Sequence, residues 1–344
     1  VYTKDKTELV AYPQNSGFIK YTVPEGVKAI RDCAFYNTNI EQIEFPDSLE
    51  YIGNRAFYYS TGLKSALLKE NVKFIGDMAF GSCSNVDLGQ IPSGLEYIGY
   101  MIFDMSGNAG ITKVDGNTYL GNWLINASVP DSTEFKIADG TVGIASSSIY
   151  TVGGVRASSV YIPASVKNIG DYILGWNYSL ATVKFEEGTT LDNIGKGMFF
   201  RDEALASITL PSTVTVINDE AFYNCKALIE IDLSNIDEIG AYAFYNCASL
   251  KEAILSNDVT ELNDAAFYGC SSLEKVKLSE RLTKLGDLIS EDAEEDVKGV
   301  FSGCTSLKEI VIPKGVNNIG KNTFNGCENL RRVIIETSSL KKVG

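Results

Sequence analysis

The sequence contains no histidine among its 344 residues. Ser-His-Asp and Cys-His nucleophilic sites, and every Cys/His zinc site, need an imidazole, so these arrangements are excluded. The chain also has no Cys-x-x-Cys pair, no glycine-rich phosphate loop and no identifiable pair of catalytic carboxylates. We therefore expect a protein that is not an enzyme, with no catalytic, metal-binding or cofactor-binding residues and no cofactor.

Positive charge is scarce. The chain has 30 Lys and Arg against 44 Asp and Glu, for a net charge of −14. No basic cluster is present, which argues against nucleic acid or an anionic membrane as the partner. No apolar run is long enough to span a bilayer, and no signal segment opens the chain. It begins at Val1 and ends on LKKVG, the first letters of another repeat, so we expect a truncated chain.

A repeat of about 23 residues runs through almost the whole sequence. The stretch AFYNCKALIEIDL at 221–233 returns as AFYNCASLKEAIL at 243–255 and AFYGCSSLEKVKL at 266–278. The unit is roughly V-x-x-I-G-x-x-A-F-x-x-C-x-x-L-x-x-I-x-L-P-x-x, and such self-similarity is typical of solenoids. Its phenylalanines are Phe35, Phe57, Phe80, Phe103, Phe199, Phe222, Phe244, Phe267, Phe301 and Phe324.

Each part of the unit predicts a local structure. In Leu228-x-x-Ile231-x-Leu233 the apolar residues alternate around an outward Asp232, as in a strand with one buried face. Glycine after the V-x-x-I pair, as at Gly240, predicts a corner in the left-handed region of the backbone. The Asp that often follows predicts a cap on a short helical turn carrying Ala-Phe.

These elements predict a repeat solenoid of the leucine-rich repeat kind, a right-handed coil with a parallel β-sheet on one face. Short helical turns and loops would lie opposite the sheet, because one unit buries its apolar side only against its neighbours. The predicted domains are an N-terminal hairpin cap at 1–26, an N-terminal repeat block at 27–103, an irregular junction with an internal hairpin and degenerate repeats at 104–158, and a C-terminal block at 159–344 that contains an acidic insertion at 288–298 and is truncated at its end.

The recurring I-G-x-x-A-F-x-x-C-x-x-L-x-x-I-x-L-P word resembles the BspA-like leucine-rich repeat family. The resemblance extends over roughly residues 20–344 and is weakest at 104–158. It implies a bacterial or protist protein of the cell surface or a secreted protein, since some relatives are adhesins for host or microbial proteins. Localisation is therefore expected to be extracellular or at the cell surface.

Six of the seven cysteines follow the repeat phenylalanine by three residues. Equivalent residues in neighbouring coils stand about 4.8 Å apart with parallel side chains, which exceeds the Cβ separation of about 3.8 Å in a disulfide. No histidine is present to activate a thiolate. We predict buried free thiols that act as small packing residues. The six are Cys83, Cys225, Cys247, Cys270, Cys304 and Cys327.

Two surfaces are candidates for binding. The first is the outward row of the predicted strands, because repeat arrays often bind proteins through such an extended face. The second is a row of tyrosines beside the core, which either stack on one another or contact a sugar or a protein. The strand-face candidates are Tyr161, Lys184, Thr209, Asp232, Ile254, Lys277, Val311 and Ile334, and the aromatic candidates are Tyr36, Tyr58, Tyr223, Tyr245 and Tyr268.

The expected function is that of a protein–protein interaction module in an adhesin-like surface or secreted protein, binding through the strand face. Its partner would be a protein of the host matrix, the host cell or another microbial surface. The alternative is a carbohydrate-binding or structural spacer segment of a larger cell-wall protein, with a glycan as partner. Neither nucleic acid nor a membrane span within the chain is expected.

Overall fold

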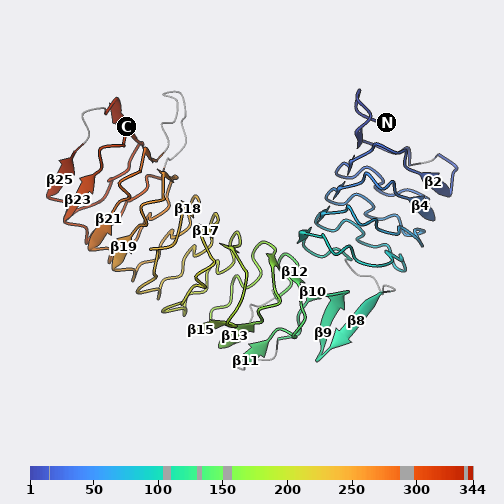
Figure 1. Cartoon of the computed structure of the whole chain (residues 1–344), viewed down its shortest axis with the longest axis horizontal. Coiled ribbons are helices and arrows are strands. Elements are labelled where there is room, and N and C mark those ends of the chain that lie inside the picture. The colour runs from blue at the N-terminus through green and yellow to red at the C-terminus, as the bar shows by residue number, and fades with distance from the viewer. Residues whose placement is uncertain are drawn as a thin grey trace. The chain divides into compact units, whose positions relative to one another are not determined.

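The computed structural model describes residues 1–14, 16–103, 110–129, 134–149, 157–286, 298–336 and 340–343 (Figure 1). The chain forms two compact units. Unit 1 comprises Val1–Ser128, Ala138–Ile149 and Asn168–Asp171, and unit 2 comprises Val129–Ile137, Tyr150–Lys167 and Tyr172–Gly344. Parts of the predicted junction at 104–158 and most of the predicted acidic insertion lie outside the described residues, and the predicted domain boundaries stay predictions.

Each coil contributes to two ladders of parallel strands, and the first ladder is formed by the V-x-x-I pair. In unit 1 the register runs Leu9, Ile30, Ile52, Ile75, Ile98, so the isoleucine position stays in line from coil to coil. The first-ladder strands are β1 (Glu8–Leu9), β3 (Ala29–Ile30), β5 (Tyr51–Ile52), β6 (Phe74–Ile75), β7 (Tyr97–Ile98), β12 (Gly143–Ile144), β14 (Asn168–Ile169), β16 (Asn193–Ile194), β17 (Val216–Ile217), β18 (Glu238–Ile239), β20 (Glu261–Leu262), β22 (Lys284–Leu285), β24 (Asn318–Ile319) and β26 (Lys342–Val343).

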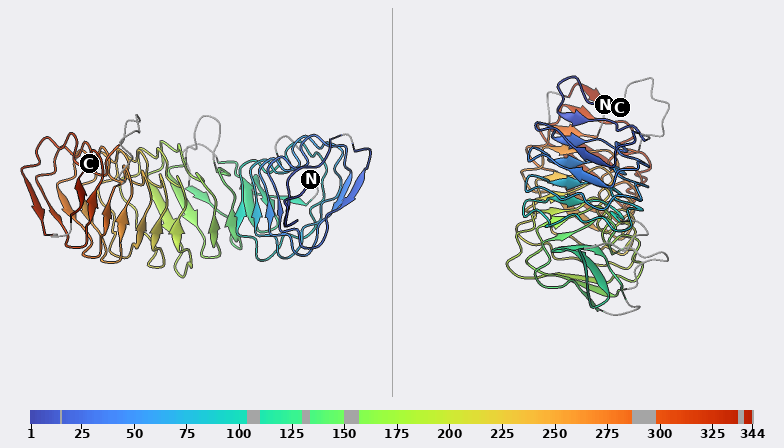
Figure 2. Two further views of the ribbon diagram at one scale, coloured as in Figure 1. Left: turned by 90° about the horizontal axis from the view of Figure 1, so that it is seen from above. Right: turned by 90° about the vertical axis from the view of Figure 1, so that its right-hand side faces the viewer.

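The second ladder is formed by the L-x-x-I-x-L segment, as predicted. Its alternation is clear at the C-terminal end of unit 2, where Ile310 and Ile312 are buried while Val311 is 38% exposed. Figure 2 shows the strands of successive coils side by side within each unit. The second-ladder strands are β2 (Lys20–Thr22), β4 (Gln42–Glu44), β11 (Glu134–Lys136), β13 (Ser159–Ile162), β15 (Thr182–Phe185), β19 (Glu252–Ile254), β21 (Lys275–Lys277), β23 (Glu309–Ile312) and β25 (Arg332–Ile335).

The core of each unit is a column of stacked phenylalanines. In unit 2 the ring centroids of Phe222 and Phe244 lie 5.3 Å apart with planes 2° apart, and Phe244 and Phe267 follow at 5.1 Å and 8°. All three side chains are fully buried. Successive coils thus bury equivalent rings against one another, and the repeat solenoid of about 23 residues is confirmed.

The segments that connect the strands of one coil differ from the prediction in the structure of their turns. The described residues contain no helix, so the short helical turns are wrong. The left-handed corner at the glycine is also wrong at Gly76, since the residue with positive φ is Met78, two positions later, at 51°. Glycine is needed there for a different reason. A Cβ atom on Gly76 would lie 2.5 Å from Oδ1 of Asn54 and 2.6 Å from its backbone nitrogen.

The residue after that glycine joins one coil to the next. Oδ1 of Asp77 accepts the backbone N–H of Tyr100 at 2.7 Å, and Oδ1 of Asp219 accepts that of Ala241 at 2.7 Å. In both pairs the partner is the equivalent residue one coil later. The predicted capping of a helix is therefore replaced by a side-chain ladder between coils, which glycine permits by letting the two backbones approach closely.

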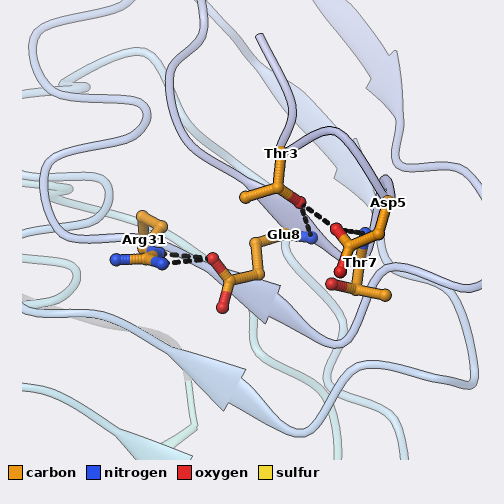
Figure 3. A network of polar contacts seen from close by, with 5 residues as sticks. All are labelled: Thr3, Asp5, Thr7, Glu8 and Arg31. Atoms are coloured by element: carbon orange, nitrogen blue, oxygen red, sulfur yellow. Dashed lines mark hydrogen bonds and ion pairs between the residues drawn. The ribbon is translucent and has the colours of Figure 1, made fainter.

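The first coil spans the segment predicted as a hairpin cap. Its strands β1 and β2 do not pair with each other, and each instead pairs in parallel with the equivalent strand of the second coil. Arg31 Nε donates to Glu8 Oε2 at 2.6 Å across the two coils (Figure 3). In the preceding turn Thr3 Oγ1 donates to Asp5 Oδ1 at 2.6 Å, and this bond is the main cause that lowers the pKa of Asp5.

An antiparallel meander lies in unit 1. Strands β8 (Ile111–Val114), β9 (Asn117–Leu120) and β10 (Trp123–Asn126) pair in antiparallel order, and β10 then pairs in parallel with β12. The internal hairpin predicted within the junction does not form between residues 123 and 141, because β10 and β11 belong to different sheets and do not pair with each other. Residues 9–27 and 123–141 each contribute to both kinds of ladder, the first through β1 and β2 and the second through β10 and β11.

Candidate functional site: the strand face and the aromatic row

The strand face is the row of outward residues on the second ladder of unit 2. Parallel register places Tyr161 opposite Lys184, Ile254 opposite Lys277 and Val311 opposite Ile334. In β13, β15, β19 and β23 the neighbours on either side of these positions point inward, whereas in the last strand, β25, the neighbours of Ile334, Val333 and Ile335, are themselves exposed. Lys184, Thr209, Asp232, Lys277 and Val311 are exposed, and Tyr161, Ile254 and Ile334 are half-buried.

The second ladder is interrupted in the middle of this face. Between β15 and β19 lie two coils, at 207–210 and 230–233, which the structure joins through a single bridge from Ser207 to Glu230. Thr209 and Asp232 lie on these coils. The sequence analysis missed the interruption, because both coils carry the same apolar alternation as their neighbours.

Three grooves follow the interruption. One of about 830 Å³ lies between the coils of Lys184 and Thr209, and one of about 720 Å³ lies between those of Thr209 and Asp232. A third, of about 340 Å³, lies between the coils of Asp232 and Ile254. Neighbouring grooves share lining residues, so together they form a channelled surface along five candidate positions, from Tyr161 to Ile254.

The charge on the strand face changes along the row. Asp232 Oδ1 accepts the backbone N–H of Ser234 at 2.9 Å, and this hydrogen bond is the largest cause that lowers the pKa of Asp232. The carboxylate is therefore charged at neutral pH. On the basic side, Lys136 Nζ lies 5.1 Å from the centroid of the Tyr161 ring, within the range of a cation–π contact.

The tyrosines form two separate groups. In unit 2, Tyr223 and Tyr245 stack at 4.5 Å and 2°, and Tyr245 and Tyr268 stack at 4.6 Å and 5°. Phe200 extends this stack with a ring 4.6 Å from Tyr223, a member that the sequence analysis missed. In unit 1, the ring centroids of Tyr36 and Tyr58 lie 6.1 Å apart.

Stacking decides which parts of the rings reach the surface. The faces of Tyr223, Tyr245 and Tyr268 cover one another, and Tyr245 is only 7% exposed. Lys298 adds a further cover, with Nζ 5.1 Å from the centroid of Tyr245, 5.6 Å from that of Tyr268, and 3.0 Å from the Tyr245 hydroxyl. The tyrosine row of unit 2 therefore presents mainly ring edges and hydroxyl groups.

The cysteine row lies inside the coils and donates hydrogen bonds. Each Sγ of the six repeat cysteines lies 3.0–3.2 Å from the carbonyl oxygen of the repeat phenylalanine in the preceding coil, as for Cys247 and Phe222. Five of the six are buried as free thiols, which confirms the packing prediction for them, and Cys327 is half-buried. Burial raises the pKa of Cys83 and Cys270 to about 12, so these thiols keep their protons.

One coil places an acid in this row. Asp202 follows Phe199 by three residues and is fully buried, with Oδ1 accepting the backbone N–H of Asn177 at 2.9 Å. Its Oδ2 has no hydrogen-bond partner, and burial raises the pKa of this carboxyl well above its ordinary value. Burial therefore favours the protonated, neutral form of this side chain. The sequence signal was an Asp at a cysteine position, and the sequence analysis missed it.

Two observations concern other kinds of site. Within the described ranges, no group of three or more Cys, Asp or Glu side chains is placed to hold a metal ion. No helix capable of crossing a membrane occurs in the same part of the chain.

The stacked coils, their two parallel ladders and the phenylalanine column define a leucine-rich repeat solenoid, a class whose arrays generally act as protein-interaction modules. The family model described as "BspA type Leucine rich repeat region (6 copies)" matches residues 11–129, 131–203, 192–294 and 297–344. The chain belongs to the BspA type leucine-rich repeat family.

The chain is similar to several solved structures. A leucine-rich cell surface protein from Faecalibacterium prausnitzii is 23% identical, with 100% of this chain and 91% of that chain covered and a TM-score of 0.40. A leucine-rich repeat protein from Bacteroides ovatus is 21% identical, with coverage of 100% and 88% and a TM-score of 0.34. The pneumococcal vaccine antigen PcpA is 17% identical, with coverage of 96% and 84% and a TM-score of 0.36. A search of curated proteins found no match.

Proposed function

We propose that the chain is a non-catalytic, protein-binding module of an adhesin-like protein, and that it binds through the strand face of unit 2. One observation carries the proposal. The inward residues of successive coils are all apolar, whereas the outward residue changes its chemical type from each coil to the next between Lys184 and Lys277. Stacking requires the first pattern and places no demand on the second, so the outward row is available for recognition.

Exposed apolar side chains add support. Val311 is 38% exposed and stands opposite the half-buried Ile334, and Ile254 lines a groove two coils earlier. Apolar groups among charged neighbours are common at the centres of protein interfaces. The partner would be a protein of a host matrix, a host cell or another microbial surface. A cell-surface or secreted location rests on family membership.

The tyrosine row offers less support for a glycan-binding role. Sugars pack against the open faces of aromatic rings, whereas the faces in unit 2 are covered by neighbouring rings and by Lys298. A glycan array comparing the wild type with a Tyr223→Ala, Tyr245→Ala and Tyr268→Ala variant tests this alternative. Glycan binding that disappears in the variant would favour the row over the strand face.

The main test is a binding screen of the full chain against purified matrix and cell-surface proteins, followed by Kd measurements on strand-face variants. We expect Ile254→Glu and Val311→Glu to weaken binding about tenfold or more, because a buried charge at an interface is costly. Val114→Glu is the matched control, since Val114 is similarly exposed at 43% but lies on the meander of unit 1. Binding that tolerates both strand-face changes would contradict the proposal.

A further inference from the structure

One junction between neighbouring coils of unit 2 is joined in the turns and open at the second ladder. In the turns, the backbone N–H of Trp176 donates to the carbonyl oxygen of Phe200 at 2.6 Å, and two similar bonds precede it. At the second ladder, no hydrogen bond joins residues 178–185 to residues 203–210, and the structure describes both segments completely. The groove of about 830 Å³ lies in this open part of the junction.

The side chain of Asp202 joins the two coils at the point where the open part begins. Its Oδ1 accepts the backbone N–H of Asn177 at 2.9 Å, and both residues are fully buried. At the corresponding position of another coil, the N–H of Cys247 instead donates to Phe244 within its own turn. We propose that Asp202 is a proton-dependent clasp, which holds the two coils together while its carboxyl group is protonated and lets the groove widen when that group ionises.

The first argument is the chemistry of the buried row that Asp202 occupies. The six repeat cysteines in this row donate to the carbonyl oxygen of the column residue one coil earlier, and Ser60 Oγ donates in the same way to Phe35 at 2.6 Å. By equivalence, the acceptor for Asp202 is the carbonyl oxygen of the buried Leu174. A protonated carboxyl group has a proton to donate to this oxygen, whereas a carboxylate only accepts. The protonated form therefore fits the row, and the ionised form does not.

The second argument is that no cation pairs with Asp202 among the described residues, and its Oδ2 has no hydrogen-bond partner. The preceding coil contributes the neutral Asn177, and the following coil contributes Cys225, whose thiol stays protonated because burial raises its pKa. The adjacent Glu203 is acidic and pairs with Lys226 at 2.8 Å. An ionised Asp202 would be an unpaired buried charge, and opening the junction to water relieves its cost.

The direction of the pH dependence follows from the burial of Asp202. Because burial raises its pKa in the folded chain, the clasp is complete at low pH and weakens as the pH rises toward the folded pKa. The proton that leaves Oδ2 passes to water. The backbone bonds in the turns, such as that from Trp176, do not depend on this proton. The junction therefore acts as a hinge that opens at the second ladder alone.

Hydrogen–deuterium exchange of the full chain, followed by mass spectrometry from about pH 4 to about pH 9, tests the clasp. Asp202→Asn cannot ionise, yet it keeps an oxygen for the Asn177 N–H and gains an amide donor. Comparing the two proteins at each pH removes the effect of pH on the exchange chemistry itself. We expect residues 178–185 and 203–210 to exchange about tenfold faster in the wild type at the high end of the range, and equally in both proteins at the low end.

Two further variants and one internal reference keep the result specific. Asp202→Cys places in this coil the residue that the row carries elsewhere, and we expect it to exchange as Asp202→Asn does. Asp237→Asn removes an exposed carboxylate of the same unit and should exchange as the wild type does. Strands β19 and β21, which pair with each other, should exchange equally in the wild type and in Asp202→Asn at every pH.

Three results would overturn the inference. The first is equal exchange of residues 178–185 and 203–210 in the wild type and Asp202→Asn over the whole pH range. The second is faster exchange that extends equally to β19 and β21, because Asp202 would then act on the whole unit and not on one junction. The third is the pH dependence of the wild type in Asp202→Cys, which would mean that another group titrates. The test involves no partner, so the proposed function of the strand face stands or falls separately.

Discussion

The phenylalanine column and the strand face of unit 2 have the same period but opposite chemistry. In the column the same ring recurs at Phe199, Phe222, Phe244 and Phe267, with centroids 5.1–5.3 Å apart. On the face the outward side chain changes from coil to coil among basic, neutral polar, acidic and apolar residues. The comparison teaches that stacking restricts the residue type at positions that contact the equivalent residue of the next coil. At positions that face water, stacking places no restriction on the residue type.

The largest expected effect comes from breaking the column. Phe222→Ala removes a fully buried ring that stacks on Phe199 and Phe244, and we expect a loss of about 3–5 kcal/mol in the free energy of unfolding. Urea denaturation followed by circular dichroism measures the loss. A denaturation midpoint close to that of the wild type would contradict the role of the column.

The next effect concerns the close approach between coils. Gly76→Ala places a Cβ atom 2.5 Å from Asn54 Oδ1, which accepts the backbone N–H of Asp77 at 2.8 Å. We expect a cost of about 1–3 kcal/mol, because the added atom forces the two coils apart. Gly62→Ala is the control, since its nearest atom lies at 3.7 Å. Equal midpoints for the two variants would show that the close approach is not limiting.

Asp202 tests whether the buried row that otherwise holds cysteines tolerates a charged side chain. Its pKa is raised in the folded chain, so the stability of the folded state is full below the unfolded pKa of about 3.9 and falls as pH rises toward the folded pKa. Asp202→Asn cannot ionise. We expect it to be more stable than the wild type by about 1–3 kcal/mol at pH 7.

The pH dependence separates ionisation from packing. The difference between Asp202→Asn and the wild type should shrink toward pH 4, because the unfolded Asp202 also becomes protonated as the pH approaches its unfolded pKa of about 3.9. Denaturation midpoints at pH 4, 5.5 and 7 measure the trend, with the exposed Asp237→Asn as the control. A difference that is constant over this range would rule out ionisation of Asp202 as its cause.

The smallest effect is expected on the strand face. Thr209 is exposed, and Thr209→Lys should change the free energy of unfolding by less than about 0.5 kcal/mol. The midpoint of urea denaturation checks this expectation. A loss comparable to that of Gly76→Ala would mean that the outward row also supports stacking, which would weaken its assignment as a recognition surface.

Much of the fold could be predicted because the same pattern of apolar and polar residues recurs in many copies of the repeat. Apolar alternation indicated the strand where the ladder forms, as at β23, but it also predicted a strand around Asp232, where the structure has only an isolated bridge at Glu230. Three-residue spacing from phenylalanine to cysteine indicated a buried row. The first ladder was missed because its strands are only two residues long, too short to show a period. Gly76 was misinterpreted because the atoms that require glycine belong to Asn54, one coil away.

The sequence predicted which residues line up along each candidate surface, but not the shape or accessibility of that surface. Period alone places Lys184, Thr209 and Asp232 in one line. It does not show that the ladder opens between their coils, because backbone pairing depends on how neighbouring coils approach each other. The tyrosine row was likewise visible as a pattern, whereas the covering of its ring faces depends on ring orientation and on Lys298.

The sequence by itself determined the solenoid, its period and the division between buried and outward positions, because apolar periodicity dictates which side chains leave water. Only the tertiary structure decided what lies one coil away. Contacts between neighbouring coils made the thiols donors, buried Asp202 and so raised its pKa, and placed Lys136 and Lys184 on either side of Tyr161. Such contacts depend on register and distance, which no single coil contains.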